Sequence, residues 1–297
     1  MSGALRKIRH LGEMALVYPA LAVVDRLPPS AAARLASGFG SLAYAADTAR
    51  RNTACENIRR SGIAADERDV RRIAKASFQH FAGVIVDSIK SDQLLEHDQW
   101  RDLVQMDIAP ECMRVLEAPG KGLILASGHL GNWEIAAQFL STIKPVVGIT
   151  RRMNNPYADR LVQRRKPRHR FRLTPKHDLD MTRFLSAIKE GEALALLVDQ
   201  YAPVKRGMMI DFFGRPASTH TSPALLHLIT RAPLCFGFCV KTGPGRFLFK
   251  APPPIEAPRS GNRQTDVKAV LDLLTHELES AIRQYPEQYL WAHRRWR

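Results

Sequence analysis

The chain has 297 residues and carries 44 Lys and Arg against 29 Asp and Glu, so its formal charge is +15 and its pI is about 10.1. Hydrophobic residues make up 45% and charged residues 25% of the chain, a composition that can bury a core and excludes disorder of the whole chain. The charge makes an ordinary neutral metabolic enzyme of the cytosol a poor fit. The length is typical of one large α/β domain, or of one domain with helical additions.

The N-terminal segment places basic residues before an apolar run from Met14 to Val24. Asp25, Arg26 and two prolines follow this run in place of the small-residue cleavage site of a signal peptide. The run contains Pro19 and falls short of the roughly 20 residues that cross a bilayer. The pattern predicts that residues 1–27 form an interfacial helix on an anionic membrane, or equally a helix packed on its own domain.

The rest of the chain divides into a helical part and a part of mixed pattern. Residues 28–110 are predicted to form a helical layer, because 30–60 are rich in Ala and Arg and 66–90 repeat apolar residues at spacings of three and four. From residue 111 onward, short apolar runs alternate with amphipathic ones. Strands are predicted at 122–127, 146–150, 193–198, 234–240 and 247–250, and helices at 133–142, 181–190, 223–230 and 265–284. This alternation predicts an α/β fold for 28–297, with a mostly parallel central sheet within 111–297 that is flanked by helices.

The cysteines and histidines give no pattern of a metal site. Cys55, Cys112, Cys235 and Cys239 contain no C-x-x-C pair, so neither a disulfide framework nor a zinc ribbon is expected. Cys235 and Cys239 are predicted to lie on one strand face as small buried hydrophobes. His276-Glu277 lacks the second histidine of a zincin, and we predict no metal.

The most informative segment runs from the predicted strand at 122–127 into His129 and then Glu134. Gly128 and Gly131 flank this histidine and permit a turn that presents it at the carboxyl end of the strand, where ligands bind in open α/β sheets. In a straight helix the two side chains would point about 140° apart, so contact between them requires that turn. A histidine held by a carboxylate can take a proton from a hydroxyl. Ser127 does not lie in the G-x-S-x-G pattern of a serine nucleophile. The simplest chemistry is therefore direct attack of a deprotonated alcohol on an activated acyl group.

The segment Ser127-Gly-His-Leu-Gly-Asn-Trp-Glu134 resembles the H-x4-D/E motif of glycerolipid acyltransferases. It has the H-x-G-N-W-E form of the bacterial lipid A secondary acyltransferases, of lauroyl and myristoyl type, and of the related phosphatidylinositol mannoside acyltransferases. Further segments resemble that family in the same order across essentially the whole chain: 51–57, 152–156, 197–200, 211–216 and 286–295.

This resemblance implies a glycerolipid acyltransferase-like fold, with 28–297 as a single acyltransferase domain. The implied activity moves a fatty acyl chain from acyl carrier protein or coenzyme A to a hydroxyl of a phosphorylated glycolipid, such as a lipid A precursor. His129 is implied as general base with Glu134 as its partner, and no cofactor is implied beyond the acyl-thioester cosubstrate. Asn132 and Asp199 are implied as substrate-binding residues, although Asp199 could equally cap a helix. The C-terminal segment around His293 is implied to anchor the active site, and Phe212-Phe213 to line an acyl channel or to form core.

Basic residues are concentrated between Arg151 and Arg172. This segment contains nine of them and a single acidic residue, Asp159, so its local charge is +8. The segment follows the strand at 146–150 and is therefore expected at the catalytic edge. There it could bind lipid phosphates or the acidic surface of acyl carrier protein, or form a solvated face attracted to an anionic leaflet. Arg152 and Arg164 are the preferred members for substrate binding, and one of them could stabilise the oxyanion.

These observations favour a peripheral or monotopic enzyme on the cytoplasmic face of the bacterial inner membrane. Another glycolipid or a lysophospholipid is an alternative acceptor. A basic nucleic-acid-binding protein is the alternative of a different class, because arginine clusters with interleaved aromatics also suit phosphate backbones. No helix-turn-helix, RRM, KH or zinc-finger pattern supports that alternative. A third alternative is a non-catalytic, membrane-bound protein of the same fold.

Overall fold

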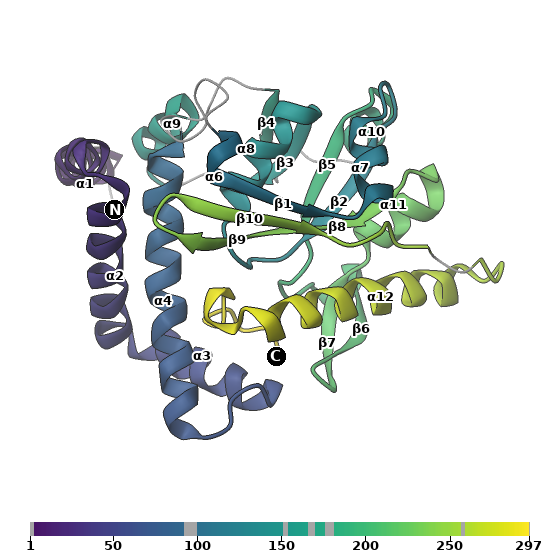
Figure 1. Ribbon diagram of the computed structural model, residues 1–297. Coiled ribbons are helices and arrows are strands. Elements are labelled where there is room, and N and C mark those ends of the chain that lie inside the picture. Colours follow the sequence, from purple (N-terminus) through teal and green to yellow (C-terminus); the bar gives the residue numbers. More distant parts are fainter. Residues whose placement is uncertain are drawn as a thin grey trace.

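The computed structural model describes residues 3–91, 100–150, 154–165, 170–175, 181–256 and 259–296, and it shows helices packed around a central parallel sheet (Figure 1). The helices are α1 (Gly3–Arg26), α2 (Pro29–Ala46), α3 (Thr48–Ser61), α4 (Glu67–Ile89), α6 (Trp100–Leu103), α7 (Pro110–Glu117), α8 (Trp133–Ile143), α9 (Pro156–Arg165), α10 (Met181–Lys189), α11 (Ser222–Thr230) and α12 (Arg263–Gln284), with short 3-10 turns η2 (Val204–Arg206) and η3 (Pro286–Gln288). The strands are β1 (Val104–Ile108), β2 (Leu123–Ser127), β3 (Val146–Thr150), β4 (Phe171–Pro175), β5 (Ala193–Leu197), β6 (Gly207–Phe212), β7 (Arg215–His220), β8 (Leu234–Phe236), β9 (Phe238–Gly243) and β10 (Arg246–Ala251).

The N-terminal helices form the predicted helical layer, in which α2 and α4 lie side by side (Figure 1). Asp47 and Asp66 start α3 and α4 by accepting hydrogen bonds from backbone amides in the first turn, and Gly62 ends α3 in the left-handed conformation. The expected helical layer of 28–110 is wrong at its end, where β1 pairs in parallel with β10. Three of the five residues of β1 are exposed, so its sequence lacks the apolar pattern of a buried strand.

The predicted α/β fold with a parallel sheet is confirmed. Five strands lie in the order β4-β3-β5-β2-β8, and every neighbouring pair is parallel. The apolar runs of β2 and β5 are mostly buried because helices cover both faces of the sheet.

The predicted strand at 234–240 is divided between two sheets. Gly237, whose amide donates to the carbonyl of Ala126 at 3.0 Å, separates β8 in the parallel sheet from β9 in the three-stranded sheet β1-β10-β9. Cys235 and Cys239 therefore lie on different strands, and both are fully buried free thiols, as expected of small hydrophobes.

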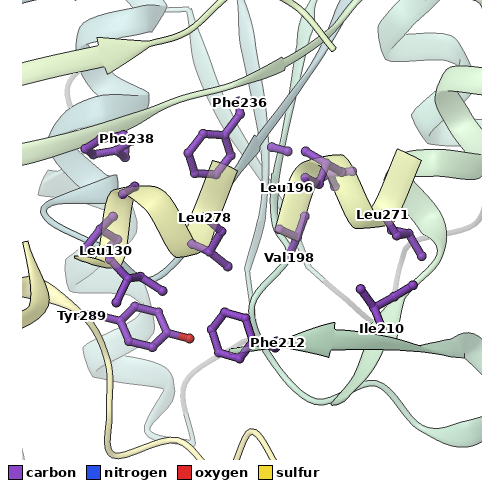
Figure 2. Packing of buried hydrophobic residues seen from close by; sticks show 14 of the residues in the cluster. Leu130, Leu196, Val198, Ile210, Phe212, Phe236, Phe238, Leu271, Leu278 and Tyr289 are labelled. Carbon is purple, nitrogen blue, oxygen red and sulfur yellow. The ribbon is translucent and has the colours of Figure 1, made fainter. Parts of the chain in front are cut away.

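The β6–β7 hairpin and α12 close the core below the parallel sheet. Figure 2 shows Leu271 and Leu278 of α12 between the sheet side chains and those of the hairpin. Phe212 and Phe213 belong to this core with exposed fractions of 1% and 8%, so they form core and not the lining of an open channel. The hairpin turn has φ of 52° at Phe213 and 69° at Gly214. Sequence rules expect Asn-Gly in such a turn, so they do not predict one with phenylalanine at its first position.

Candidate active site

Two adjacent parallel strands bring His129 and Asp199 together at one edge of the sheet. Ser127 at the end of β2 pairs with Leu197 at the end of β5, and each functional residue follows its strand by two positions. The amide of Val198 continues the pairing by donating to the carbonyl of Ser127 at 2.9 Å. Both side chains therefore lie at the carboxyl edge, the usual place for a ligand site in an open α/β sheet.

Asp199 holds His129 through both of its oxygens. The backbone amide of His129 donates to Oδ2 at 2.8 Å, and Nδ1 of the imidazole donates to Oδ1 at 2.8 Å. An ionised carboxylate only accepts hydrogen bonds, so in the neutral imidazole the ring proton lies on Nδ1 and Nε2 carries a lone pair. The side-chain amide of Gln200 donates to this Nε2 at 3.3 Å. The imidazole is 16% exposed and the carboxylate 3%, so the nitrogen available to a substrate belongs to the more open member of the pair.

Burial and pairing oppose each other in setting the charges of this pair. Burial lowers the pKa of His129, but the charge and the hydrogen bond of Asp199 outweigh it, and the net pKa lies above the ordinary value. Burial acts to raise the pKa of Asp199, and the bonds and charge of the imidazole reverse this, so that pKa is lowered. Burial and the nearby carboxylate also raise the pKa of Tyr289, whose neutral phenol is hydrogen-bonded to Asp199. The carboxylate thus remains ionised and can stabilise an imidazolium.

We expected Glu134 to be the carboxylate partner of His129, and this expectation is corrected. The structure places Asp199, and not Glu134, at Nδ1 of the imidazole. Glu134 is half-buried in the first turn of α8, and its catalytic role stays a prediction. The helix-capping alternative for Asp199 is wrong, because both carboxylate oxygens bond His129 and none of the described helices begins there.

Asn132 shapes the loop that carries His129. It is fully buried and caps α8, since its Oδ1 accepts from the amide of Ile135 at 3.0 Å. Its Nδ2 donates to Asp87 at 3.4 Å, and Lys241 forms an ion pair with the same carboxylate at 2.8 Å. The amide is thereby committed to protein partners, while the substrate contact predicted for it stays untested. Asp87 and Lys241 lie in a helix and a strand far apart in the chain, and no motif marks them.

The C-terminal segment clamps the loop from the other side, as the family resemblance implied. The carbonyl of His129 accepts from the amide of Leu290 at 3.1 Å, and the amide of Gly131 donates to Gln288 at 2.9 Å. Gly131 has φ +62°, and a Cβ there would lie 2.0 Å from the carbonyl oxygen of Cys239. The clamp and the close approach of β9 explain the glycine in this motif.

His293 serves as part of this clamp. Its Nε2 accepts from the amide of Tyr201 at 3.1 Å, so this nitrogen is committed to the segment that follows Asp199. Asn57 of α3 donates to the carbonyls of Trp291 and His293 at 2.7 and 2.6 Å. The helical layer is thereby tied to the active site through the C-terminal segment.

The basic segment between β3 and β4 is divided between opposite edges of the sheet. Because β3 and β4 are parallel, the chain leaves at the carboxyl edge and must return to the amino edge. Arg170 donates there to the last carbonyls of α8, and Arg172 forms an ion pair with Glu192. Arg152 lies outside the described residues, and Arg164 lies in the last turn of α9 with its side chain outside them, so their substrate roles stay predictions.

The family model described as bacterial lipid A biosynthesis acyltransferase matches residues 1–297. The chain belongs to this family. It is therefore an O-acyltransferase, as the resemblance predicted. It is 24% identical over 283 residues to the lipid A biosynthesis lauroyltransferase of Escherichia coli strain K12, covering 93% of this chain and 88% of that protein. Among solved structures, the 1-acyl-sn-glycerophosphate acyltransferase PlsC of Thermotoga maritima matches with 10% identity and a TM-score of 0.36, covering 84% of this chain and 95% of that one.

Proposed function

We propose that this acyltransferase moves a fatty acyl chain from an acyl-thioester, on acyl carrier protein or coenzyme A, to a hydroxyl of a phosphorylated lipid A precursor. The observation that carries the mechanism is the pair His129–Asp199 at the carboxyl edge, in which the carboxylate accepts from Nδ1 and leaves Nε2 as the basic nitrogen of the neutral imidazole. The family supports lipid A as the acceptor class. The acyl-thioester is the cosubstrate, and the proposal requires no metal or other cofactor.

The proposed reaction is a direct transfer without an acyl-enzyme. The acceptor hydroxyl replaces the amide of Gln200 at Nε2, and the imidazole takes the proton as the oxygen attacks the thioester carbonyl carbon. The C–S bond of the resulting tetrahedral intermediate then breaks, and the imidazolium returns its proton to the departing thiolate. The products are the ester and the free thiol. Asp199 stabilises the imidazolium between these two steps.

The outward surface of α1 supports a place on the membrane. None of the described helices is long and apolar enough to cross a bilayer. One face of α1 is packed on the protein through Met14 and Val24. The opposite face exposes apolar side chains three to seven residues apart, with exposed fractions of 57% at Leu5, 66% at Ile8, 48% at Leu11 and 56% at Tyr18. Apolar residues beside cations suit an anionic leaflet, whereas a nucleic acid backbone would leave the exposed leucines without partners.

The packed side of α1 contacts the segment that follows β3 at the catalytic edge. Asn155, which follows β3 by five residues, donates to the carbonyl of His10 at 3.0 Å and to Glu13 at 2.8 Å. Exposed Lys7 and Arg9 flank the apolar face of α1. We therefore propose a peripheral or monotopic protein on the cytoplasmic face of the inner membrane, with the acceptor lipid presented from that leaflet.

The mechanism is tested with His129→Ala and the surface control His276→Ala, each assayed with acyl carrier protein and coenzyme A thioesters and a lipid A precursor. Loss of the general base should reduce turnover by about 10²–10⁴-fold, and the control should retain wild-type turnover. Full activity of a folded His129→Ala protein would contradict the mechanism.

Mass spectrometry of lipids from cells with and without the enzyme identifies the acceptor, because the product gains the mass of one acyl chain. That gain on another glycolipid or on a lysophospholipid would overturn the lipid A assignment.

The membrane proposal is tested by co-sedimentation with phosphatidylglycerol or phosphatidylcholine vesicles. The double variant Leu5→Glu/Ile8→Glu should lose binding to the anionic vesicles. The matched control Ile229→Glu, which changes a side chain 55% exposed on α11, should keep it. Equal binding by both variants would remove α1 from the membrane contact. Salt-sensitive binding to DNA or RNA, without acyl transfer, would favour the nucleic-acid alternative.

A further inference from the structure

An apolar path leads from the imidazole of His129 to the protein surface. The ring of Trp133 lies 5.0 Å from the imidazole, centroid to centroid, with 66° between the planes. The ring of Phe81 lies 5.5 Å from that of Trp133, and both aromatic side chains are half-buried. One turn further along the same face of α4, Ile85 is 64% exposed. The reacting imidazole is therefore connected to the open surface by apolar side chains.

The other sides of the imidazole are occupied or polar. Asp199 takes Nδ1, and the amide of Gln200 lies at Nε2. The interior beyond the loop is filled, since Leu130 and Phe236 are fully buried in the core drawn in Figure 2. A hydrocarbon chain whose carbonyl reaches His129 cannot enter that core without displacing packed side chains. Within the described part of the chain, the side of Trp133 offers it apolar contact.

The core does not account for the exposed face of α4. Val86 of α4, with Ala82 and Ile89 beside it, packs against Ala32 and Ala36 of α2, and Val70, Ile73 and Ala74 of the same helix belong to the main core. Ile85 and Phe81 lie about 100° and about 140° around the helix from Val86, and neither belongs to a core cluster of the described residues. Their apolar surface is thus additional to what packing of the layer uses.

We propose, on the basis of the proposed function, that Trp133, Phe81 and Ile85 form the subsite for the fatty acyl chain of the thioester donor. The thioester carbonyl lies at His129, the first methylenes pass Trp133, and the methyl end extends past Phe81 toward Ile85. The polar acceptor approaches from the side of Gln200. Methylenes that extend beyond Ile85 then make no further contact with the protein, so Ile85 sets the longest chain for which added length improves binding.

Transfer rates for decanoyl, lauroyl, myristoyl and palmitoyl carrier protein test this subsite. Each contacted methylene should raise kcat/KM about fourfold, up to the length at which the chain passes Ile85. Ile85→Ser should remove the gain in kcat/KM per methylene for the longest contacted chains only. Phe81→Ala should remove this gain for shorter chains as well. Ile229→Ser, which changes a comparably exposed side chain on α11, should leave the dependence unchanged.

A second measurement uses the wild-type sequence at the subsite and does not depend on variants that fold. A thioester with a photoreactive diazirine at the methyl end is irradiated on His129→Ala enzyme, which retains the donor, and the labelled peptide is identified by mass spectrometry. Label on α4 supports the subsite. Label on the strands β8 and β9, or one chain-length profile shared by all variants, would overturn it. Absence of transfer by the wild-type enzyme from every donor would instead contradict the proposed function.

Discussion

Replacement of Asp199 by Asn separates the two tasks of this carboxylate. Its oxygens accept from two different donors of His129, the backbone amide and Nδ1, both at 2.8 Å. An asparagine has one acceptor, so either a buried N–H loses its partner, at a cost of about 1–3 kcal/mol, or the amide turns toward Nδ1 and moves the ring proton to Nε2. Both outcomes remove the negative charge that stabilises the imidazolium, and the second also places the ring proton on the nitrogen that must act as base, so we expect turnover to fall about 10²–10⁴-fold.

The same substitution should move the pH dependence toward lower pH. The free enzyme is active when His129 is neutral, so kcat/KM rises as pH passes the raised pKa of this residue. Without the negative charge, burial remains and lowers that pKa. A charged hydrogen bond of about 1.5–3 kcal/mol corresponds to a shift of roughly one to two pH units.

The assay measures kcat/KM against pH for wild type, Asp199→Asn and the matched carboxylate variant Glu134→Gln. We expect the acid limb to move only in Asp199→Asn, whatever Glu134→Gln does to turnover. Circular dichroism in the near ultraviolet checks that both variants retain their packing. If Glu134→Gln moves the acid limb and Asp199→Asn leaves it in place, the partner assigned here to the imidazole is wrong.

Three further predictions concern the surroundings of this pair. Gln200→Glu replaces a donor at Nε2 by an acceptor that favours the imidazolium, so the acid limb of kcat/KM should move to higher pH, whereas an unchanged profile would remove Gln200 from contact with the base. Gly131→Ala should lower the free energy of unfolding by about 3 kcal/mol or more in urea, because its Cβ meets a backbone carbonyl. Gly120→Ala, with a similar φ of +66° but open space, should cost only about 1 kcal/mol. Asn57→Ala leaves two carbonyls without their donor and should cost about 1–3 kcal/mol in the same assay, against no measurable change for the exposed Asn52→Ala.

The sequence predicts the elements and the catalytic histidine because their signals are local. The apolar spacing in α4 and the buried run of β2 each lie within one short segment, and the glycines beside His129 mark the turn directly. The charge of the segment after β3 can also be read from the sequence, but the position of its basic side chains in the fold cannot. Arg170 caps a helix and Arg172 pairs with Glu192 at the far edge of the sheet, which depends on how the connection crosses the sheet.

The carboxylate partner of His129 could not be chosen from the sequence for a related reason. Glu134 is five positions away and Asp199 is seventy, so proximity along the chain favours the former. The sheet order β4-β3-β5-β2-β8 inserts β5 directly beside β2, and β5 comes from the chain after two other strands. Apolar runs predict each strand but are too similar to say which strands are neighbours.

The register of β2 and β5 therefore determines the chemistry as well as the packing. Ser127 pairs with Leu197, and His129 and Asp199 each lie two positions further on. A slip of one residue would turn the side chains of a strand to the opposite face, and it would also force the buried Leu and Ala residues into the packing of the other helix layer. The buried residues Leu125 and Leu196 thus help to fix the distance between imidazole and carboxylate, although they lie within the sheet and away from the substrate. A large-to-small change at such a position should loosen the pair before it unfolds the domain, so it should shift the pH profile at temperatures at which the protein remains folded.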